Sequence, residues 1–529
     1  MLICGFHSGH ECSYCVLNNG IPVIHAELER YTREKEPFGD GLKLFFEDYP
    51  YYNNIKYFSH VLCTWKGGIQ KRYHDTYRKM WKIITQNDGN FFIPGHHESH
   101  AANAFFSSNF DESLIISIDG GGKEYLNDDV ESVSVGVFYG KKNKLTPLFF
   151  VPSIKINIGT MWSRFTEHIF GLSIGYPKGN QAGTVMAMAA INKDEQFVEY
   201  IEKAEMNPYL LKYKPLIEAA QKSDEDKYAI AYALQKNTEI NIITIIRVAE
   251  QYLKELGAKS TKNLCFSGGV ALNSVAMGKI TNYNLYIPPV PYDAGLAIGN
   301  AQYVYHHILD NPRIKWEDNA TPYLGKKYPL ETIDMTIKEY SNQINCKKAN
   351  DDYIINLLAE QKIIAIFNGK SESGRRALGN RSIIADPRSS TMKSQINEKV
   401  KHRQWFRPFA PSVLREEVFN WFDRDVDSPY MNIVVNIRPE KIEEIPAVAH
   451  LDNTARIQTV TEKDNKWYYN LIKKWQLKTG IPILLNTSFN DREPIVETPK
   501  DAIECFLKTE IDYVYFPEKD LLISKKETK

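Results

Sequence analysis

His96 and His100 are the residues whose types and spacing most directly suggest chemistry. They lie four apart in His96-His97-Glu98-Ser99-His100, and residues four apart project from one face of an α-helix, so both imidazoles can hold one cation. Imidazole suits zinc, iron, nickel or copper. The order His-His-Glu argues against a zincin protease, whose motif is His-Glu-x-x-His. The alternative is the start of a surface helix with scattered histidines.

Two aspartates are candidates to complete a metal site with this pair. Asp119 ends a predicted strand at a glycine-rich loop, and Asp293 lies at a predicted strand-to-helix switch. Two histidines and two aspartates would form a mixed nitrogen and oxygen site with open positions for substrate oxygens. Taken singly, each aspartate is also explained as a helix cap or a turn residue.

A second glycine loop, Ser267–Asn273, follows a predicted strand and opens a predicted helix. We expect Gly268, Gly269 and Asn273 to approach phosphate or sugar oxygens, because glycine exposes backbone N–H groups and a helix start carries partial positive charge. The loop is neither a Walker A loop nor a Rossmann fingerprint. We expect His10 and Lys35 to face the same cleft. His10, in the first loop, is either a base for a substrate hydroxyl or structural.

Two stretches near the C-terminus concentrate cations among glycines and aromatics. They are residues 366–382, with Lys370, Arg375, Arg376 and Arg381, and residues 399–411, with Lys399, Lys401, Arg403, Arg407 and three aromatic residues. The whole chain is neutral, with 65 Lys and Arg against 65 Asp and Glu, so a local excess predicts an anionic partner. Overall neutrality argues against a nucleic-acid binder, and a nucleotide is the predicted anion. A solvated charged face is the alternative.

Two similar strand patterns must position the N-terminal candidates. Residues 2–6, 15–17 and 21–26 read as strands, with an Asn-Gly turn before the third, and residues 114–118, 133–139 and 145–151 repeat the pattern around a glycine loop at 119–122. Helical spacing covers residues 225–257, and further elements are expected as a strand over 264–269, a helix over 270–279, a strand over 285–288 and a helix over 293–305. The repetition predicts a duplicated α/β domain.

The rest of the chain predicts a second domain of the α+β class. Composition turns polar over residues 318–350, and we place the boundary there, giving domains 1–340 and 341–529. Strands are expected over 363–367, 433–437 and 483–486. No apolar run approaches about 18 residues, so we expect no membrane span. The start lacks a signal-peptide pattern and seven cysteines are too scattered for a disulfide framework, so we expect a cytoplasmic protein.

The motifs together resemble the NodU/CmcH family of carbamoyltransferases. Matching segments run along nearly the whole chain: Gly9–Ser13, Glu27–Arg30, His96–Ala101, Asp119-Gly120, Ser267–Asn273, Asp293–Ala301, Arg376–Arg388, Lys401–Leu414, His450–Val460 and Leu484–Asn490. Arg376–Ser382 together with Trp405–Pro411 is the most specific pair. Glu11 stands where the family usually has Asp. After Asp119 the family usually has a glycine followed by Glu; here the corresponding residues, Gly122-Lys123-Glu124, are shifted by one position.

The resemblance implies an architecture and a set of site residues. A duplicated ASKHA-type (actin/Hsp70-like) α/β domain over 1–340 would bind metal and transfer the carbamoyl group, and a YrdC-like α+β domain over 341–529 would form carbamoyl adenylate. Carried over by motif, the metal ligands are His96, His100, Asp119 and Asp293, and the metal is iron (Fe²⁺). The adenylation pocket would include Arg376, Lys401, Arg407, Arg456 and Ser488, the first three being catalytic.

The function implied is an ATP-dependent O-carbamoyltransferase of a biosynthetic pathway. Carbamoyl phosphate and ATP, with Mg²⁺, would give carbamoyl adenylate, and the carbamoyl group would pass to a hydroxyl of a sugar or secondary metabolite, with His10 as base. The resemblance is compatible with a homodimer. Two other functions stay open: an ASKHA-type kinase or ATPase, which would form ADP, and a non-catalytic metal- and nucleotide-binding scaffold, which would bind ATP without turnover.

Overall fold

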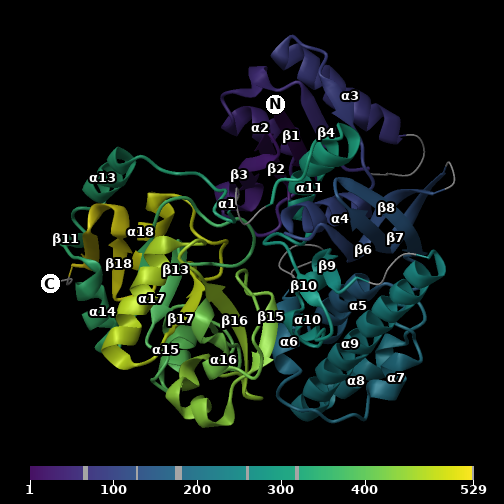
Figure 1. Cartoon of the computed structure of the whole chain (residues 1–529). Coiled ribbons are helices and arrows are strands. Elements are labelled where there is room, and N and C mark those ends of the chain that lie inside the picture. Colours follow the sequence, from purple (N-terminus) through teal and green to yellow (C-terminus); the bar gives the residue numbers. More distant parts are fainter. Residues whose placement is uncertain (63–68, 127–128, 173–180, 258–260, 316–320, 527–529) are drawn as a thin grey trace. The chain divides into compact units, whose positions relative to one another are not determined.

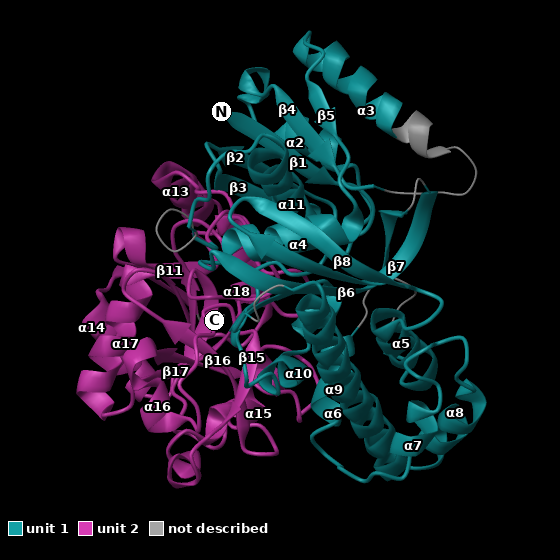
Figure 2. Cartoon of the chain, turned by 45° about the vertical axis from the view of Figure 1, so that its right-hand side comes forward, with its two compact units in different colours: residues 1–322 teal, residues 323–529 magenta. Residues whose placement is uncertain are grey.

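The computed structural model describes residues 1–62, 69–126, 129–172, 181–257, 261–315 and 321–526, and they form helices and strands throughout (Figure 1). The chain divides into two compact units, residues 1–322 and 323–529 (Figure 2). The division lies before the predicted boundary at 340, because α13 (Leu330–Glu339) packs against α18 (Pro499–Lys508) of the second unit. Lys500 and Glu339 pair across this contact at 3.1 Å. Residues 318–320 of the polar stretch lie outside the described residues.

The first unit contains two five-stranded sheets of identical topology. The first sheet has the order β3-β2-β1-β4-β5 and the second the order β10-β9-β6-β7-β8. In each, three antiparallel strands come first in sequence and two strands parallel to the first follow. The strands are β1 (Leu2–His7), β2 (Ser13–Asn18), β3 (Ile21–Glu27), β4 (Tyr57–His60), β5 (Asn90–Phe92), β6 (Glu112–Leu126), β7 (Asp129–Lys141), β8 (Lys144–Pro152), β9 (Asn263–Ser267) and β10 (Asn284–Tyr286). The predicted duplicated α/β fold is confirmed.

Two helices pack against each other between these sheets. α4 (His96–Ser107) lies on the sheet of β6 and β9, and α11 (Leu296–Gln302) lies on the sheet of β1 and β2 (Figure 2). A buried chain of hydrogen bonds crosses the layer: Ser99 Oγ donates to Asn300 Oδ1 at 2.7 Å, and Asn300 Nδ2 donates to the Phe6 carbonyl at 3.0 Å. This chain of hydrogen bonds fixes α4 and α11 next to each other.

Helices complete the first unit. They are α1 (Leu28–Thr32), α2 (Gly41–Asp48) and α3 (Ile69–Thr85) with the first sheet, and α5 (Ile158–Arg164), α6 (Ala182–Met188), α7 (Val198–Glu202), α8 (Tyr213–Lys222), α9 (Asp224–Glu255) and α10 (Ser274–Gly278) around the second. The predicted helix over 225–257 is confirmed as α9. Ser223 caps the start of this helix, because its Oγ accepts a hydrogen bond from Asp226 N at 3.1 Å.

Three local predictions need correction. The glycine loop at 119–122 is instead part of strand β6, because the pairing with β7 steps from Ile118–Val135 to Gly122–Val133 and so leaves a bulge of three unpaired residues. The helix over 270–279 is broken into a 3₁₀ turn (Gly269–Leu272) and α10, since Asn273 between them has a non-helical backbone. The helix over 293–305 begins as a 3₁₀ turn (Asp293–Gly295) and ends as a π-helix (Tyr303–Ile308).

The second unit is built on one nine-stranded mixed sheet, which agrees with the predicted α+β class. Its order is β11-β19-β18-β12-β13-β17-β14-β16-β15. The strands are β11 (Ile344–Lys348), β12 (Ile364–Phe367), β13 (Arg381–Ala385), β14 (Ala410–Leu414), β15 (Ile433–Asn436), β16 (Thr454–Val460), β17 (Ile483–Ser488), β18 (Tyr513–Phe516) and β19 (Leu521–Lys525). The remaining helices are α14 (Asp351–Ala359), α15 (Met392–Lys399), α16 (Val418–Trp421) and α17 (Lys466–Thr479).

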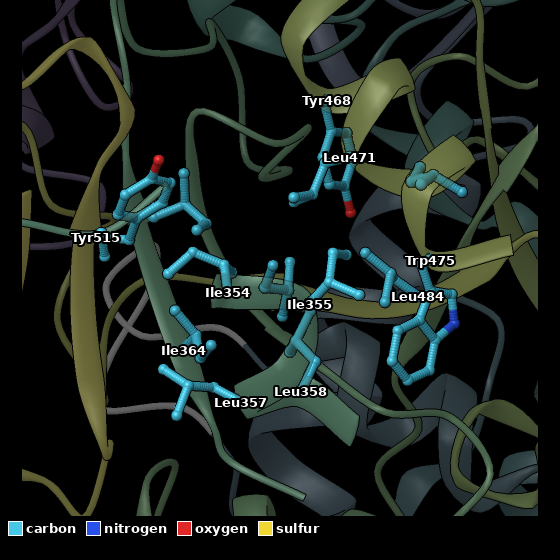
Figure 3. Close-up of a cluster of buried hydrophobic side chains, with 14 of the residues drawn as sticks. Ile354, Ile355, Leu357, Leu358, Ile364, Tyr468, Leu471, Trp475, Leu484 and Tyr515 are labelled. Carbon is cyan, nitrogen blue, oxygen red and sulfur yellow. The ribbon is translucent and has the colours of Figure 1, made fainter. Parts of the chain in front are cut away.

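An apolar core holds α14 and α17 to this sheet. Ile354 and Leu358 of α14 meet Leu471 and Trp475 of α17 over Leu484 of β17, all fully buried (Figure 3). Burying one such aliphatic side chain contributes about 1.5–3 kcal/mol, so this cluster fixes the strands that carry the C-terminal candidates. None of the helices in the described ranges is long and apolar enough to cross a membrane.

Candidate metal centre and phosphate pocket

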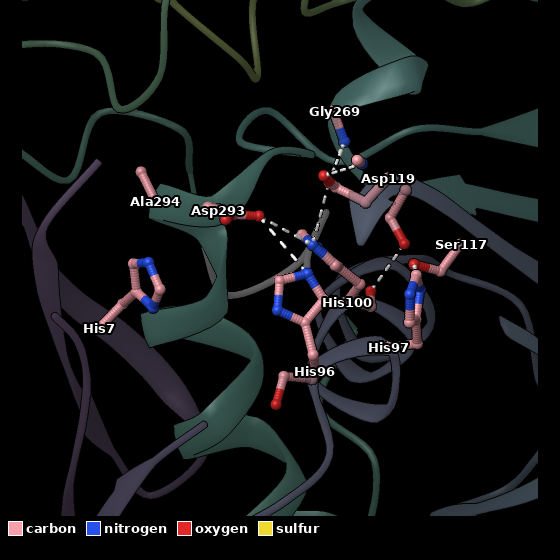
Figure 4. Close-up of polar contacts among 12 residues, drawn as sticks. His7, His96, His97, His100, Ser117, Asp119, Gly269, Asp293 and Ala294 are labelled. Atoms are coloured by element: carbon pink, nitrogen blue, oxygen red, sulfur yellow. Dashed lines mark hydrogen bonds and ion pairs between the residues drawn. The ribbon is translucent and has the colours of Figure 1, made fainter. Parts of the chain in front are cut away.

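The four predicted metal ligands converge in the first unit (Figure 4). His96 and His100 come from the first two turns of α4, Asp119 from the β6 bulge, and Asp293 from the turn before α11. One ligand atom from each lies within 4.8 Å of all the others. His100 Nε2 is 3.5 Å from Asp119 Oδ2 and 3.3 Å from Asp293 Oδ1, and His96 Nε2 is 3.6 Å from that same Asp293 oxygen. We call these four residues the quartet.

The quartet fits a divalent cation by its chemistry. His100 is fully buried, and His96 Nε2 has no hydrogen-bond partner among the described residues. Burial alone would lower the pKa of His100, but hydrogen bonds with Asp119 and Asp293 raise it to about 9. Burial likewise opposes ionisation of Asp293, yet the surrounding histidines hold its pKa well below the usual range. Two imidazole nitrogens and two ionised carboxylates suit Fe²⁺, and also zinc or manganese.

His97, between the two quartet histidines in sequence, faces the other way. Its Nδ1 lies 2.8 Å from Ser117 Oγ and its Nε2 lies 3.0 Å from the Val133 carbonyl. Burial, with the neighbouring histidines, lowers its pKa to about 3, so it is a neutral core residue. The spacing of four therefore distinguishes the two histidines that enter the quartet from His97.

Glu124 is a supporting residue that the sequence reasoning noted only as a departure from a pattern. Its Oε1 accepts from the backbone N–H of His97 and, at 3.3 Å, from that of Glu98, so it caps the helix that carries the two histidines. A Cβ on Gly122 would lie 2.1 Å from the His96 ring, so the strand can pass His96 only with glycine there. The bulge in β6 sets the spacing from Asp119 to Glu124.

The glycine loop Ser267–Asn273 contacts the quartet. Gly269 N donates to Asp119 Oδ2 at 2.5 Å. Gly268 has φ +86°, and a Cβ there would lie 2.2 Å from the Ile118 carbonyl oxygen, so the close approach to β6 requires glycine. Asn273 caps α10 and exchanges hydrogen bonds with Gln235 at 2.8 and 3.2 Å. The loop orients a metal ligand; a nucleotide contact by these residues stays a prediction.

His10, Glu11 and Lys35 differ in their surroundings and in their exposure to solvent. His10 Nε2 is 3.3 Å from Asp293 Oδ2, so His10 stands next to the quartet with a side chain 33% exposed. Glu11 belongs to the same group of converging ligand atoms as His10 and Asp293. Lys35 is exposed in the segment between α1 and α2.

In the second unit, Lys401 and Ser488 are brought together. Lys401 is 2% exposed, and its Nζ donates to the Ser488 carbonyl at 2.5 Å and to Asn490 Oδ1 at 2.7 Å. Ser488 Oγ donates to the same Asn490 oxygen at 2.7 Å. This buried ammonium fixes the end of β17; a phosphate contact by Ser488 stays a prediction.

Four arginines of the second unit lie close enough for their like charges to repel one another, and we name them the arginine cluster: Arg376, Arg403, Arg407 and Arg456. Burial and the three neighbouring guanidinium groups hold the pKa of Arg456 well below its usual range. In the described part of the chain no carboxylate pairs with Arg403, Arg407 or Arg456. Arginine stays protonated in proteins, so this concentration of charge calls for an anionic ligand.

Arg403 was not among the predicted site residues, although it lies in the basic stretch. Asn397 of α15, fully buried, positions it: Asn397 Oδ1 accepts from Arg403 Nε at 2.8 Å, and Asn397 Nδ2 donates to the Arg407 carbonyl at 3.0 Å. Trp405, between these arginines, is 60% exposed. The alternation of Arg and aromatic residues was the available sequence signal, but only the fold shows which cations face inward.

Comparisons with known proteins show the family to which the chain belongs. A family model described as the carbamoyltransferase N-terminus matches residues 25–302, and one described as the carbamoyltransferase C-terminus matches residues 355–525. The chain is 36% identical to "Uncharacterized protein sll1178" of Synechocystis sp., over 79% of this chain and 74% of that protein. It is 32% identical to "Nodulation protein NolO" of Bradyrhizobium diazoefficiens, over 79% and 76%. It is 27% identical to "3'-hydroxymethylcephem-O-carbamoyltransferase" of Amycolatopsis lactamdurans, over 60% of each.

Proposed function

The chain belongs to the carbamoyltransferase family, and from that premise we propose that it is an ATP-dependent O-carbamoyltransferase. Residues 341–529 would form carbamoyl adenylate, and residues 1–340 would transfer its carbamoyl group to a hydroxyl of a sugar or secondary metabolite. One observation carries the proposal: the chain holds both a quartet suited to a cation and an arginine cluster suited to a polyphosphate. The name of the Amycolatopsis relative, an O-carbamoyltransferase, supports a hydroxyl as acceptor.

The arginine cluster accounts for the first reaction. Water releases carbamate and inorganic phosphate from carbamoyl phosphate; a carbamate oxygen then bonds to the α-phosphorus of ATP, and the bond to pyrophosphate breaks. Arg376, Arg407 and Arg456 neutralise the charge that builds on the phosphate oxygens, with Mg²⁺ bound to ATP. Lys401 holds Ser488 beside this charge by donating to its Oγ at 3.3 Å. Arginines that repel one another in the free protein gain most from such a ligand.

The quartet accounts for the transfer. The acceptor oxygen bonds to the carbamoyl carbon, AMP leaves, and the hydroxyl gives up its proton, for which His10 stays the predicted acceptor. A cation held by His96, His100, Asp119 and Asp293, iron in our proposal, would polarise the carbamoyl carbonyl. The protein's own part is to hold the ligands: α4 is capped by Glu124, and Gly269 N orients Asp119.

Two alanine variants test this division of labour. Arg407→Ala should lower pyrophosphate release from carbamoyl phosphate and ATP about 100-fold or more, the usual effect of removing one charge-stabilising group. His100→Ala should leave pyrophosphate release within about twofold and block transfer. Exposed Arg247→Ala and His168→Ala are the matched controls and should change neither.

Several outcomes would reject the proposal. Loss of pyrophosphate release in His100→Ala would contradict the separation of the two reactions. ADP formed with a sugar would favour a kinase, and ATP binding without any product would favour a scaffold. Mass spectrometry of metabolites incubated with the protein, ATP and carbamoyl phosphate, searching for an added carbamoyl mass, would identify the acceptor.

A further inference from the structure

Asp293 presents its two carboxylate oxygens to two different groups of ligand atoms. Oδ1 faces the quartet, 3.3 Å from His100 Nε2 and 3.6 Å from His96 Nε2. Oδ2 faces the first loop, 3.3 Å from His10 Nε2. A carboxylate used in this way commonly bridges two cations. With one cation in the quartet, Oδ2 would still be directed at a second set of donors.

That second set meets the geometric requirement for a cation of its own. Ligand atoms from His10, Glu11 and Asp293 all lie within 4.8 Å of one another. Metal–nitrogen and metal–oxygen bonds of about 2.0–2.2 Å place neighbouring ligand atoms about 3–4 Å apart, and the His10–Asp293 separation of 3.3 Å falls in that range. The His10 side chain is 33% exposed, so substrate or water could fill the remaining coordination positions.

The first loop is held in the shape that brings these donors together. Glu11 has φ 55°, in the left-handed region that a non-glycine residue adopts at a cost. Nε2 of His7 donates to the His10 carbonyl at 3.2 Å, while His7 Nδ1, buried, has no hydrogen-bond partner among the described residues. On the other side, Gly9 and Gly39 exchange backbone hydrogen bonds at 2.9 Å. The loop is therefore preorganised from both ends.

We propose that His10, Glu11 and Asp293 bind a second divalent cation, and that Asp293 bridges it to the cation of the quartet. The set has one imidazole and two carboxylates, so it is richer in oxygen than the quartet and favours Mn²⁺, Fe²⁺ or Mg²⁺. The inference rests on the proposed function for its role, which is to supply positive charge beside the acceptor hydroxyl. A cation on Nε2 would prevent His10 from taking the proton, so in this arrangement the proton of the acceptor hydroxyl would pass to solvent water, which reaches the site beside the 33% exposed His10.

Metal counting on the full chain tests the site directly. Metal-free protein is titrated with Mn²⁺, passed through a desalting column and analysed for manganese, with electron paramagnetic resonance to detect exchange-coupled pairs. The wild type should hold two Mn²⁺ per chain and show the coupled spectrum. Glu11→Gln, which keeps side-chain size and the backbone requirement, should hold one uncoupled Mn²⁺. Glu47→Gln, an exposed acid of α2, should behave as wild type.

His10→Gln is the second variant, and circular dichroism checks that each variant folds. One Mn²⁺ per chain in the wild type at saturation, or two in both Glu11→Gln and His10→Gln, would overturn the second site. The same preparations are assayed for pyrophosphate release and carbamoyl transfer. One Mn²⁺ with both activities intact rejects the second site alone; two Mn²⁺ with neither activity rejects the proposed function and leaves the second site standing.

Discussion

At the scale of single residues, each unit gathers charged side chains of one kind of site: carboxylates beside imidazoles in the first unit and arginines in the second. Asp293 and Asp119 stay ionised beside two imidazoles, and three arginines of the second unit lack a carboxylate partner in the described ranges. Burying a charge is costly unless a partner of opposite sign is supplied. The residues in the two sites thus point to a cation in the first unit and a polyanion in the second.

Arg403→Lys should weaken the reaction of ATP without unfolding the protein. Lysine keeps the positive charge but loses the planar fork that binds phosphate bidentately and that Asn397 holds through Nε. We expect the KM for ATP in pyrophosphate release to rise about 10-fold, the equivalent of one lost charge-assisted hydrogen bond. Steady-state kinetics would measure it, with Arg247→Lys as control. An unchanged KM would remove Arg403 from the pocket.

At the scale of elements, helix starts and a strand bulge bring together residues far apart in sequence. The first turn of α4, the β6 bulge and the turn before α11 each contribute to the quartet, and α15 holds the segment with Arg403 and Arg407 through one asparagine. The bulge is the least regular of these elements. It turns Asp119 toward the metal centre and still returns β6 to register before Glu124.

Glu124→Ala should destabilise the first unit and weaken metal binding together. The substitution leaves the buried N–H of His97 without its acceptor, at a cost of about 1–3 kcal/mol. It also loosens the turn that carries His96 and His100. Urea unfolding and Mn²⁺ titration would measure the two effects. Glu131→Ala, at the paired position on β7 but exposed, is the control; equal effects in both variants would contradict the capping role.

At the scale of the whole molecule, both units hold several buried histidines, outside the quartet, whose pKa values are lowered. Burial lowers the pKa of His7 and His306 to about 4 and that of His97 and His450 to about 3. The unfolded chain has histidine pKa values near 6.5. Below that pH the unfolded state binds protons that the folded state does not, so the contribution of these histidines is complete above about pH 6.5 and falls as the pH drops toward 4.

Acid should therefore lower the thermal midpoint of the metal-free protein between pH 6.5 and pH 5. His306, whose ring contacts that of Phe106 with centroids 4.7 Å apart, belongs to neither site and offers a clean test. At pH 5 the lowered pKa of His306 reduces the free energy of unfolding by about 2 kcal/mol. His306→Asn should therefore make the fall in this free energy between pH 6.5 and pH 5 smaller by about that amount. Calorimetry in EDTA would show it. An identical acid slope in the variant would refute the assignment.

The sequence by itself determined the fold class, the two-part organisation and the residue types of the sites. The alternation within strands and the repeated hairpins were enough to predict the duplicated domain, because the periodicity of side chains in the sequence depends directly on local secondary structure. Histidines four apart, and arginines among aromatics, sufficed to indicate a cation and a phosphate. These signals are local in the chain.

Only the tertiary structure decided which candidates meet. Asp119 and Asp293 are far apart in sequence, and their approach depends on two sheets packing around α4 and α11. The bulge that replaces the expected loop, the capping by Glu124, the hydrogen bond between Asn397 and Arg403, and the position of Asp293 between the quartet and His10 depend likewise on long-range contacts. Periodicity cannot encode them, because each depends on atoms supplied by another element.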